Sequence, residues 1–421
     1  MEPAERLRID RAALLLVDLQ RDFLAPDGPL ARLGWCGIPA ADVPLLVERC
    51  QALVGALHDA RRPVVFVTTA FRADYADCAW AAPWRARLPA AGGGCLVEGS
   101  AGRALLDGLA PRADDYMVVK KGHGAFLHTV LDRLLANLGA EHCIIAGGDV
   151  PGSISDTVRL GAALGYEQFV VEDAVYPLGS PDLPTLRNRV EYVTTRDVLR
   201  RAAMPAPPRA DPAAVPCALL VVDIQNDFVH RDGAQRRYGY SGLTDADVER
   251  VIANNQRLIA AVRARGWPVI FVRDVQTRHG LDTALPRPIR RLNPMPPEAQ
   301  FIKEGAWGAA FVDALQPQAG DVEIVKRGNS AFGFTPLHRA LRNLGVRHCL
   351  VSGGAVHGCL SDTVREGAGL GYALTIVADA AYPPDSPYLE LLTHRAGIRS
   401  TDEVLAALDR PAAATPSGLS C

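Results

Sequence analysis

The cysteines of the chain follow none of the sequence patterns that are typical of a metal site or a redox motif. Its nine cysteines form no CxxC pair and no Cys/His spacing typical of a zinc site. In a reducing compartment an odd number of cysteines indicates free thiols and not a disulfide framework. We therefore expect no structural disulfide and no structural zinc.

Long apolar runs and an excess of one charge are also missing. The longest apolar run near the start, Ala12 to Val17, is too short to span a membrane or to form the core of a signal peptide. The formal net charge is -2 with both signs interspersed, so the sequence gives no basis for a nucleic-acid face or a polybasic membrane anchor. We expect a cytoplasmic protein with a small-molecule substrate, no nucleic-acid partner and no membrane partner.

The chain does contain an internal duplication. The words ALLLVDLQRDF and ALLVVDIQNDF open the two copies, and AGGDVPGSISDTVRLGAALGY recurs later as SGGAVHGCLSDTVREGAGLGY. An offset of roughly 205 residues corresponds to a whole domain, because solenoid repeats are several-fold shorter. We predict one domain over residues 1–203, a Pro/Ala-rich linker over 204–216, a second domain over 217–409 and a flexible tail over 410–421.

Each copy alternates between two hydrophobic patterns. Continuous apolar runs predict strands that are buried on both faces, and the stretches between them have helical spacing. In the first copy the strand-like runs are Leu14–Val17, Val64–Val67, Tyr116–Val119, Cys143–Ala146 and Phe169–Val171, and the helical stretches include Val43–Ala60 and Leu127–Leu138. We predict an α/β fold in each half, with three layers (α/β/α) around a mainly parallel sheet. Such folds bind ligands at the carboxyl ends of the strands.

Three reactive side chains in the second copy follow predicted strands. Asp223 and Lys326 each end an apolar run, and Cys359 begins a helix, where the backbone dipole lowers the pKa of a thiol. Taken singly, a charged residue commonly caps a strand and a small cysteine commonly packs in a core. Together they predict a site where a carboxylate takes the thiol proton, an ammonium keeps that carboxylate ionised and the thiolate attacks a carbonyl. The turn 353–358 would then supply backbone N–H groups for the oxyanion.

The words LLVVDIQNDF, VKRGNSAFGFT and SGGAVHGC resemble those of the isochorismatase-like cysteine hydrolase superfamily, which includes nicotinamidases, N-carbamoylsarcosine amidohydrolase and isochorismatases. The resemblance covers nearly the whole chain twice. It implies that Asp223, Lys326 and Cys359 form a catalytic triad and that Cys359 forms a thioester-type acyl intermediate. It also implies a cis peptide at Gly354-Ala355 and an oxyanion hole made by the N–H groups of Ala355 and Cys359.

One motif of the superfamily is incomplete in this chain. Nicotinamidases resemble one another in a metal-binding Asp-x-His with a further histidine. Here Asp274 is followed by Gln276 in place of the first histidine, and we interpret His279 as a solvated loop residue. We expect no metal and no cofactor. The Gly358-Cys359 pair is similar to that of the carbamoylsarcosine and maleamate-like branch, which uses no metal.

Five side chains near the predicted triad are candidates for contact with a substrate. They are Gln225, Phe228, Trp307, Phe334 and His357. Core packing is the simpler explanation for an aromatic side chain. Trp307, Phe334 and His357 are nevertheless replaced by other residue types in the first copy, which favours a substrate contact, although sequence drift also explains such differences.

The first copy keeps Asp18 and Lys120 but has Ser153 at the position of the nucleophile. A serine hydroxyl is a much poorer nucleophile than a thiol unless a base removes its proton. We prefer the interpretation that this first site is degenerate and that its domain shapes the second site. Two alternatives are vinyl-ether hydrolysis by an acidic Asp, as the resemblance to isochorismatases implies, and activation of Ser153 by His123.

For the whole chain we predict a cysteine-dependent hydrolase of an amide, carbamoyl or related C–N bond, acting through the second domain. The alternatives are an isochorismatase-type vinyl-ether hydrolase that works through Asp223 or Asp18 without covalent catalysis, and a non-catalytic binding or scaffold protein. The superfamily is usually oligomeric, and a tandem fusion holds two domains at high effective concentration. We therefore expect an intramolecular pseudo-dimer, with further homo-oligomerisation left open.

Overall fold

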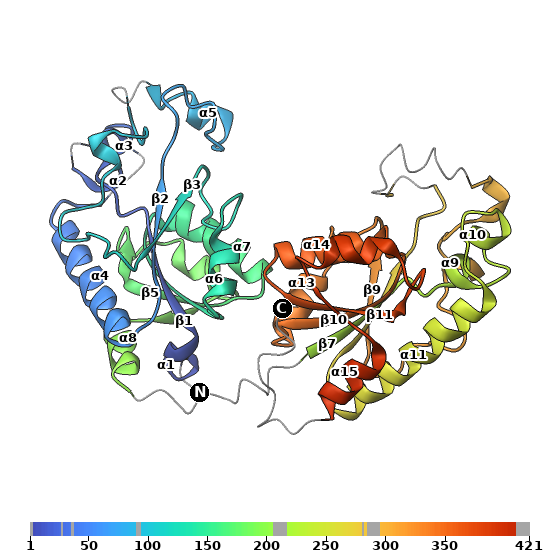
Figure 1. Cartoon of the computed structure of the whole chain (residues 1–421). Coiled ribbons are helices and arrows are strands. Elements are labelled where there is room, and N and C mark those ends of the chain that lie inside the picture. The colour runs from blue at the N-terminus through green and yellow to red at the C-terminus, as the bar shows by residue number, and fades with distance from the viewer. Residues whose placement is uncertain are drawn as a thin grey trace. The chain divides into compact units, whose positions relative to one another are not determined.

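The computed structural model describes residues 3–26, 28–34, 38–89, 94–204, 217–279, 282–283 and 295–409. The chain divides into two compact units, Met1–Arg209 and Ala210–Cys421 (Figure 1). The predicted linker, apart from Met204, and the predicted tail lie outside the described residues. The domain boundaries drawn from the repeat therefore stay predictions at these places.

The N-terminal unit is built on a six-stranded parallel sheet in the order β3-β2-β1-β4-β5-β6. Its strands are β1 (Ala12–Val17), β2 (Val64–Thr69), β3 (Tyr116–Lys120), β4 (His142–Gly148), β5 (Glu167–Tyr176) and β6 (Glu191–Val193). Its α-helices are α1 (Pro3–Arg6), α2 (Arg21–Leu24), α3 (Pro29–Arg32), α4 (Asp42–Asp59), α5 (Ala82–Arg85), α6 (Leu131–Asn137), α7 (Ser155–Ala163) and α8 (Thr195–Ala202).

Both faces of this sheet are covered, because successive side chains of a strand point to opposite sides. Leu14 and Leu16 of β1 belong to one core cluster, which includes Leu53 of α4. Leu15 of β1 belongs to the other cluster, which includes Leu135 of α6. Helices α4 and α8 lie on one face of the sheet and α6 and α7 on the other (Figure 1). Burial on both sides is why the strands appear in the sequence as continuous apolar runs.

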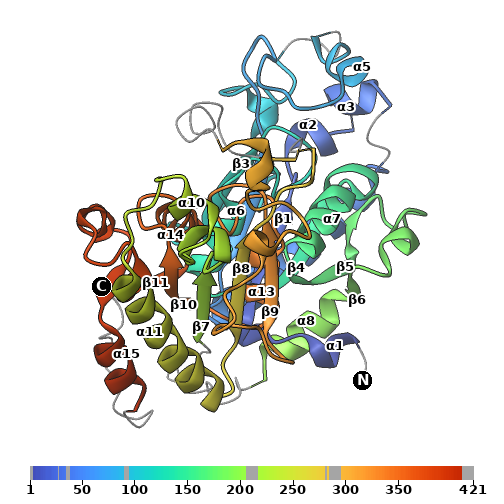
Figure 2. The same ribbon diagram turned by 90° about the vertical axis from the view of Figure 1, so that its right-hand side faces the viewer.

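The C-terminal unit repeats this arrangement, with the sheet order β9-β8-β7-β10-β11-β12 and parallel pairing throughout. Its strands are β7 (Cys217–Val222), β8 (Val269–Asp274), β9 (Val322–Lys326), β10 (His348–Gly354), β11 (Ala373–Tyr382) and β12 (Gly397–Arg399). Its α-helices include α9 (Asn226–Val229), α10 (Ala234–Arg237), α11 (Asp245–Ala264), α13 (Leu337–Asn343), α14 (Cys359–Gly369) and α15 (Thr401–Leu408). Helices α11 and α15 run along one side of this sheet (Figure 2).

The predicted α/β fold with two copies of a three-layer domain is confirmed, and each sheet is wholly parallel. The sixth strands, β6 and β12, were not predicted, because three residues at the edge of a sheet leave no apolar run. The predicted helix Leu127–Leu138 begins later, at Leu131, because His128 has a positive φ of 56° and belongs to the preceding turn.

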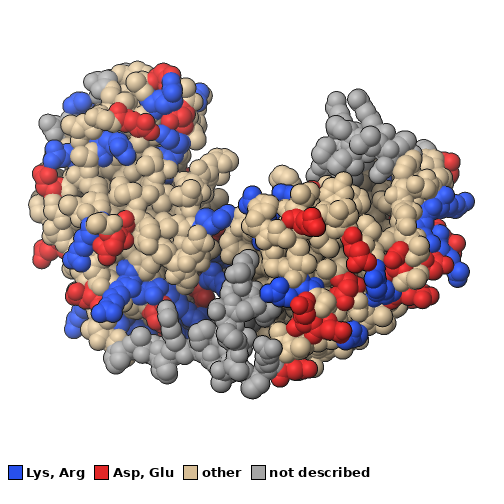
Figure 3. All heavy atoms as spheres, viewed as in Figure 1, with Lys and Arg blue, Asp and Glu red and all other residues tan. Residues whose placement is uncertain are grey.

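The described helices and the face drawn in Figure 3 bear on the expectations for membrane spans and for charge. Among the described residues, no helix combines the length and the apolar character needed to cross a bilayer. On the face seen in Figure 3, acidic and basic side chains are intermixed on each unit. This distribution agrees with the near-neutral formal charge of the sequence.

A buried amide at the centre of α11 offers a test of the packing in the C-terminal unit. Asn255 donates hydrogen bonds to the carbonyl oxygens of Val251 and Ala380, both at 2.8 Å, and accepts one from the Ser352 hydroxyl at 2.6 Å. We expect Asn255→Ala to lower the free energy of unfolding of this unit by about 3 kcal/mol, because buried polar groups lose their partners. Cys50→Ala, at the equivalent apolar position of α4, serves as the control and should cost about 1 kcal/mol.

Hydrogen exchange in increasing urea, analysed by mass spectrometry of peptides from each unit, measures the two effects separately. Equal losses for the two substitutions would contradict the assignment of a hydrogen-bonded core at Asn255.

Candidate active site

The C-terminal unit brings the three predicted catalytic side chains together at the carboxyl edge of its sheet, where β7, β9 and β10 end. The Lys326 Nζ atom lies 2.8 Å from Asp223 Oδ2 and donates a hydrogen bond to Cys359 Sγ at 3.3 Å. It also donates to the carbonyl oxygen of Gly328 at 2.8 Å. Lys326 is therefore the centre of the cluster, in contact with both the carboxylate and the thiol.

The backbone at the ends of β7 and β10 explains why these side chains meet. Asp223 follows β7 with a φ of 52°, and its carbonyl oxygen accepts a hydrogen bond from the Tyr382 hydroxyl at 2.7 Å. In the adjacent strand Gly353 has a φ of 85°, and a Cβ atom there would lie 1.9 Å from the carbonyl oxygen of Val222. Only glycine permits this approach. The strand that carries Asp223 can therefore lie directly beside the turn that leads to Cys359.

That turn presents backbone donors next to the thiol. The Gly354-Ala355 peptide is cis, as the family resemblance implied. Val356 and Leu360 donate their N–H groups to backbone oxygens of the turn and of β11. The N–H groups of Ala355 and Cys359 have no acceptor among the described residues. Because Cys359 is the first residue of α14, its N–H group also lies at the positive end of the helix dipole.

The residues of the cluster differ in their exposure to solvent. Asp223 and Lys326 are fully buried, whereas Cys359 is partly exposed. The other cysteines in the described part of the chain are all buried. Cys359 is thus the only one of these three residues with solvent-exposed surface, while the two charged groups that contact its thiol are shielded from water.

The electrostatics differ from the sequence prediction in one respect. Burial raises the pKa of the Cys359 thiol well above its ordinary value, and the carboxylates of Asp223 and Asp274 raise it further, against the opposing charge of Lys326. The predicted lowering of the thiol pKa is therefore wrong for the resting protein. Burial also raises the pKa of Asp223, although Lys326 opposes this shift. The thiol thus keeps its proton at rest, beside a carboxylate whose affinity for a proton is increased.

Lys326 remains a cation in this setting. Burial alone would lower the pKa of its ammonium group, but the charges of Asp223, Cys359 and Asp274 outweigh burial and hold the pKa well above its ordinary value. A fixed positive charge is therefore available whenever negative charge develops on the sulfur.

Asp274 is a member of the cluster that the sequence analysis did not assign to it. It ends β8, is 2% exposed, and its Oδ2 atom lies 3.5 Å from Lys326 Nζ. Its Oδ1 atom has no hydrogen-bond partner among the described residues. Burial raises the pKa of Asp274 to about 6, with Asp223 adding to the shift and Lys326 opposing it. Asp274 ends an apolar run in the sequence, as Asp223 does, and this pattern could have predicted its place in the cluster.

Asn329 is a second residue that the sequence analysis left out of the site. Its Oδ1 atom lies 4.0 Å from Cys359 Sγ, and its Nδ2 group donates to Asp362 Oδ2 at 2.8 Å. It follows β9 by three residues and so reaches the same edge of the sheet as Lys326. The amide therefore borders the thiol on the side of the loop after β9.

The predicted pocket residues have varied surroundings. The buried Gln225 amide donates to the carbonyl oxygens of Asp274 and Ala309, both at 2.9 Å, so it links the end of β8 to the segment around Ala309. Phe228 packs edge-to-face against Phe301 with ring centroids 5.6 Å apart.

The other three predicted pocket residues are exposed. Trp307 packs against His230 with centroids 5.0 Å apart, and His357 packs against Tyr388 at 5.8 Å. Phe334 is fully exposed. A substrate contact by any of the five residues stays a prediction.

The N-terminal unit repeats the central contacts with a serine in place of the cysteine. Lys120 Nζ lies 2.8 Å from Asp18 Oδ2, and the Ser153 hydroxyl donates to the same oxygen at 2.6 Å. The Thr69 hydroxyl, at the place of Asp274, donates to Asp18 Oδ1 at 2.8 Å. Asp18 is thus hydrogen-bonded through both of its carboxylate oxygens.

Two features separate this first site from the second one. The carboxylate of Asp149, which follows the cis peptide Gly148-Asp149, accepts a hydrogen bond from the Ser153 N–H at 3.0 Å. In the C-terminal unit the equivalent N–H belongs to Cys359 and has no described acceptor. In addition, Ser153 is only 1% exposed, so its hydroxyl is closed to a ligand.

His123 does not act on Ser153 through a described hydrogen bond. Its ring stacks on Trp80 with centroids 5.1 Å apart, and the Ser153 hydroxyl is instead joined to Asp18 and Lys120. Burial and the charge of Lys120 lower the pKa of His123. The serine therefore lacks the hydrogen bond to an imidazole base that activation would need.

The described residues contain no group of three or more His, Cys, Asp or Glu side chains placed to hold a metal ion. His279 is exposed. The ligand set of the metal-dependent branch therefore does not assemble around Asp274 in the part of the chain that the structure describes.

Two segments, residues 12–185 and 217–402, match the isochorismatase domain family. The chain therefore belongs to this family and carries one such domain in each unit. The predicted superfamily and its tandem duplication are confirmed.

Two similar proteins are named as amidohydrolases. The chain is 32% identical over 211 residues to ureidoacrylate amidohydrolase RutB of Pseudomonas syringae pv. syringae (strain B728a), which covers 47% of this chain and 83% of that protein. The enzyme of the same name from Serratia proteamaculans (strain 568) is 32% identical over 217 residues, with 46% and 84% covered. A crystal structure of a cysteine hydrolase from Pseudomonas syringae pv. phaseolicola 1448A is 25% identical, with a TM-score of 0.41, and covers 49% of this chain and 99% of that one. The two amidohydrolases belong to the predicted enzyme class, the hydrolases of non-peptide C–N bonds.

The raised pKa of Asp274 predicts how stability depends on pH. Because its pKa rises from 3.8 to about 6 on folding, the folded protein holds this proton more tightly than the unfolded chain does. The term that Asp274 adds to the free energy of unfolding is therefore largest below about pH 4 and falls by about 3 kcal/mol as pH rises to about 6. Asp274→Asn removes this term.

Urea unfolding of the C-terminal unit in the wild-type protein and in Asp274→Asn, measured between pH 4 and pH 7, checks the prediction. The advantage of the wild type should shrink as pH rises. An advantage that is constant or grows with pH would show that Asp274 is ionised in the folded protein at low pH.

Proposed function

We propose that the C-terminal unit hydrolyses an amide, carbamoyl or related C–N bond of a small molecule through Cys359. The observation that carries this proposal is the thiol of a partly exposed cysteine, Cys359, in contact with a buried Asp223–Lys326 ion pair. Two backbone N–H groups without a described acceptor lie in the same turn. The names of the amidohydrolase relatives support a ureido or carbamoyl substrate.

In the first half of the proposed reaction the thiol proton moves to Asp223 as the sulfur attacks the carbonyl carbon. The raised pKa of Asp223 favours acceptance of this proton, and the Lys326 ammonium stabilises the sulfur while it is negatively charged. The carbonyl oxygen becomes an oxyanion, which accepts hydrogen bonds from the N–H groups of Ala355 and Cys359. Asp223 then returns its proton to the nitrogen, the C–N bond breaks, and an acyl thioester remains on Cys359.

In the second half water attacks the thioester. Asp223 accepts a proton from the water, the same two N–H groups hold the new oxyanion, and the C–S bond breaks. The sulfur leaves as a thiolate beside Lys326 and recovers its proton from Asp223. One water is consumed, an amine or ammonia and an acid are released, and the three side chains return to their starting protonation states.

The N-terminal unit, in contrast, is proposed to be non-catalytic. Its nucleophile position is a buried serine, and the N–H group that would bind an oxyanion already donates to Asp149. A carbonyl substrate would have to displace this carboxylate before it received the hydrogen bond. Both the access and the charge of the site therefore oppose acyl transfer at Ser153.

We expect Cys359→Ala to reduce turnover at least about a thousandfold, because the covalent route is lost. Ammonia or amine release from a panel of ureido and carbamoyl compounds, read by mass spectrometry, measures turnover. A slowly hydrolysed substrate should leave an acyl group on the Cys359 peptide of the wild-type protein. Turnover that persists in Cys359→Ala would contradict the covalent mechanism.

The matched substitution in the first unit separates the two sites. Ser153→Ala should leave kcat and KM within about twofold of wild type, since its hydroxyl has no part in the proposed chemistry. The measurement uses the same substrate panel. A fall in kcat as large as that of Cys359→Ala would assign catalysis to both units.

A further inference from the structure

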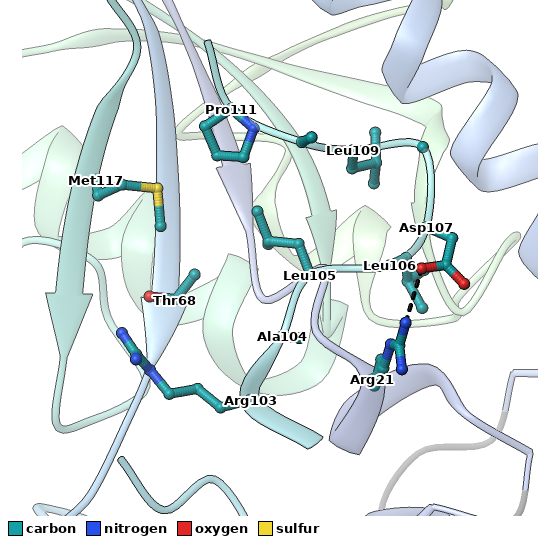
Figure 4. A pocket seen from close by; sticks show the side chains of 12 residues that line it. Arg21, Thr68, Arg103, Ala104, Leu105, Leu106, Asp107, Leu109, Pro111 and Met117 are labelled. Carbon is teal, nitrogen blue, oxygen red and sulfur yellow. Dashed lines mark hydrogen bonds and ion pairs between the residues drawn. The ribbon is translucent and has the colours of Figure 1, made fainter. Parts of the chain in front are cut away.

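A cavity in the N-terminal unit lies apart from the Asp18 cluster. It has a volume of about 560 Å³ and is bordered by β2, β3 and the segment 103–111 (Figure 4). Thr68 of β2 lines it, whereas the neighbouring Thr69 hydroxyl faces Asp18. Because adjacent residues of a strand point to opposite sides, the cavity and the Asp18 cluster lie on different faces of the sheet. Its size is in the range of small-molecule sites.

Two backbone contacts beside this cavity recur in both units. Gln20 donates to the carbonyl oxygens of Thr69 and Arg103 at 2.9 and 2.8 Å, and Gln225 makes the two equivalent bonds in the C-terminal unit, both at 2.9 Å. The position of Thr68 therefore corresponds to that of Arg273. Any difference between the two units at this place comes from the side chains.

In the C-terminal unit an arginine occupies the corresponding place. The Arg273 guanidinium lies over the Phe311 ring, 5.9 Å from its centroid, and its Nη2 atom is 3.5 Å from Glu323. The equivalent residues of the N-terminal unit are Thr68, Leu105 and Met117. A threonine is much shorter than an arginine, and the exchange of Glu323 for Met117 also removes the acidic partner of that arginine.

The polar groups of the cavity are incompletely paired. Thr68 Oγ1 and Arg103 Nε are buried, and neither has a hydrogen-bond partner among the described residues. Arg21, in contrast, is 2.7 Å from Asp107. Figure 4 shows Thr68 and Arg103 on one side of the cavity and the Arg21–Asp107 pair on the other. Buried polar atoms without partners are rare in folded proteins and indicate a missing ligand or water.

Arg103 distinguishes this cavity from its counterpart in charge as well as in size. The equivalent residue of the C-terminal unit is Ala309. The N-terminal unit therefore has no counterpart of the Arg273 side chain at this place, but it has a different cation, Arg103, beside the cavity. In the C-terminal unit the cation lies over an aromatic ring, whereas in the N-terminal unit the cation lines a cavity that a ligand can enter.

We propose that this cavity binds a small organic carboxylate. The carboxylate accepts hydrogen bonds from the Arg103 guanidinium and the Thr68 hydroxyl, a geometry that suits the planar fork of arginine. The apolar body of the ligand lies against Leu105, Leu109 and Met117. One unpaired guanidinium matches a single negative charge, whereas a dianionic phosphate would keep an uncompensated charge. The inference is independent of the chemistry proposed at Cys359.

The C-terminal unit supplies the variants that test this proposal. Arg103→Ala introduces the alanine that the other unit has, and Thr68→Arg with Met117→Glu introduces the ion pair that fills the space there. Ligand-observed NMR titrations of the full chain use hexanoate and benzoate as probes. The comparison probes are 1-hexanol, hexylammonium and inorganic phosphate. Melting curves check that each variant is folded.

We expect wild-type protein to bind hexanoate and benzoate in preference to the three comparison probes. Arg103→Ala should weaken carboxylate binding about tenfold or more, because a charge-assisted hydrogen bond is lost. The double variant should abolish carboxylate binding in this cavity. Neither variant should change the affinity of a carboxylate for the C-terminal unit. If the double variant does not fold, Arg103→Ala alone decides. Unchanged carboxylate binding in Arg103→Ala, or a preference for phosphate or hexylammonium, would overturn the proposal.

Discussion

The buried ion pair at the carboxyl edge of each sheet is the interaction on which both sites depend. Asp223 and Lys326 are fully buried at 2.8 Å, and Asp18 and Lys120 repeat that distance in the other unit. Removing one partner of such a pair leaves an uncompensated buried charge, which typically costs about 3–5 kcal/mol. The fold must therefore keep both strand ends in register. The glycine beside β7 and the tyrosine hydroxyl on the Asp223 carbonyl help to do so.

The sequence predicted the architecture well because the strands are buried on both faces. Runs such as Val64–Val67 have no other simple explanation, and the repeated words fixed the equivalence of the two halves. The short edge strands β6 and β12 escaped prediction because each has only three residues. Their place in the sheet is set by pairing with β5 and β11, which is a tertiary property.

The composition of the site was predictable in part. Asp223, Lys326 and Cys359 meet as expected, because parallel strands deliver their ends to one edge. The protonation of the thiol was not predictable, since it depends on burial and on Asp274, whose carboxylate reaches Lys326 from β8. A helix N-terminus and one lysine favour the thiolate, but two nearby carboxylates and the loss of solvent outweigh them. Such a balance is visible only when distances are known.

The Asp149 carboxylate occupies, in the first unit, the hydrogen-bonding position next to the nucleophile for which the second unit has no acceptor among its described residues. In the Cys359 site a negative oxygen would rest on the N–H of α14 only during the lifetime of a tetrahedral adduct. In the first unit a carboxylate oxygen of the chain itself, from Asp149, is hydrogen-bonded to the equivalent N–H. A single exchange, Asp149 in place of Ala355, thus places in the first unit an oxygen where the mechanism proposed for Cys359 would form one only briefly.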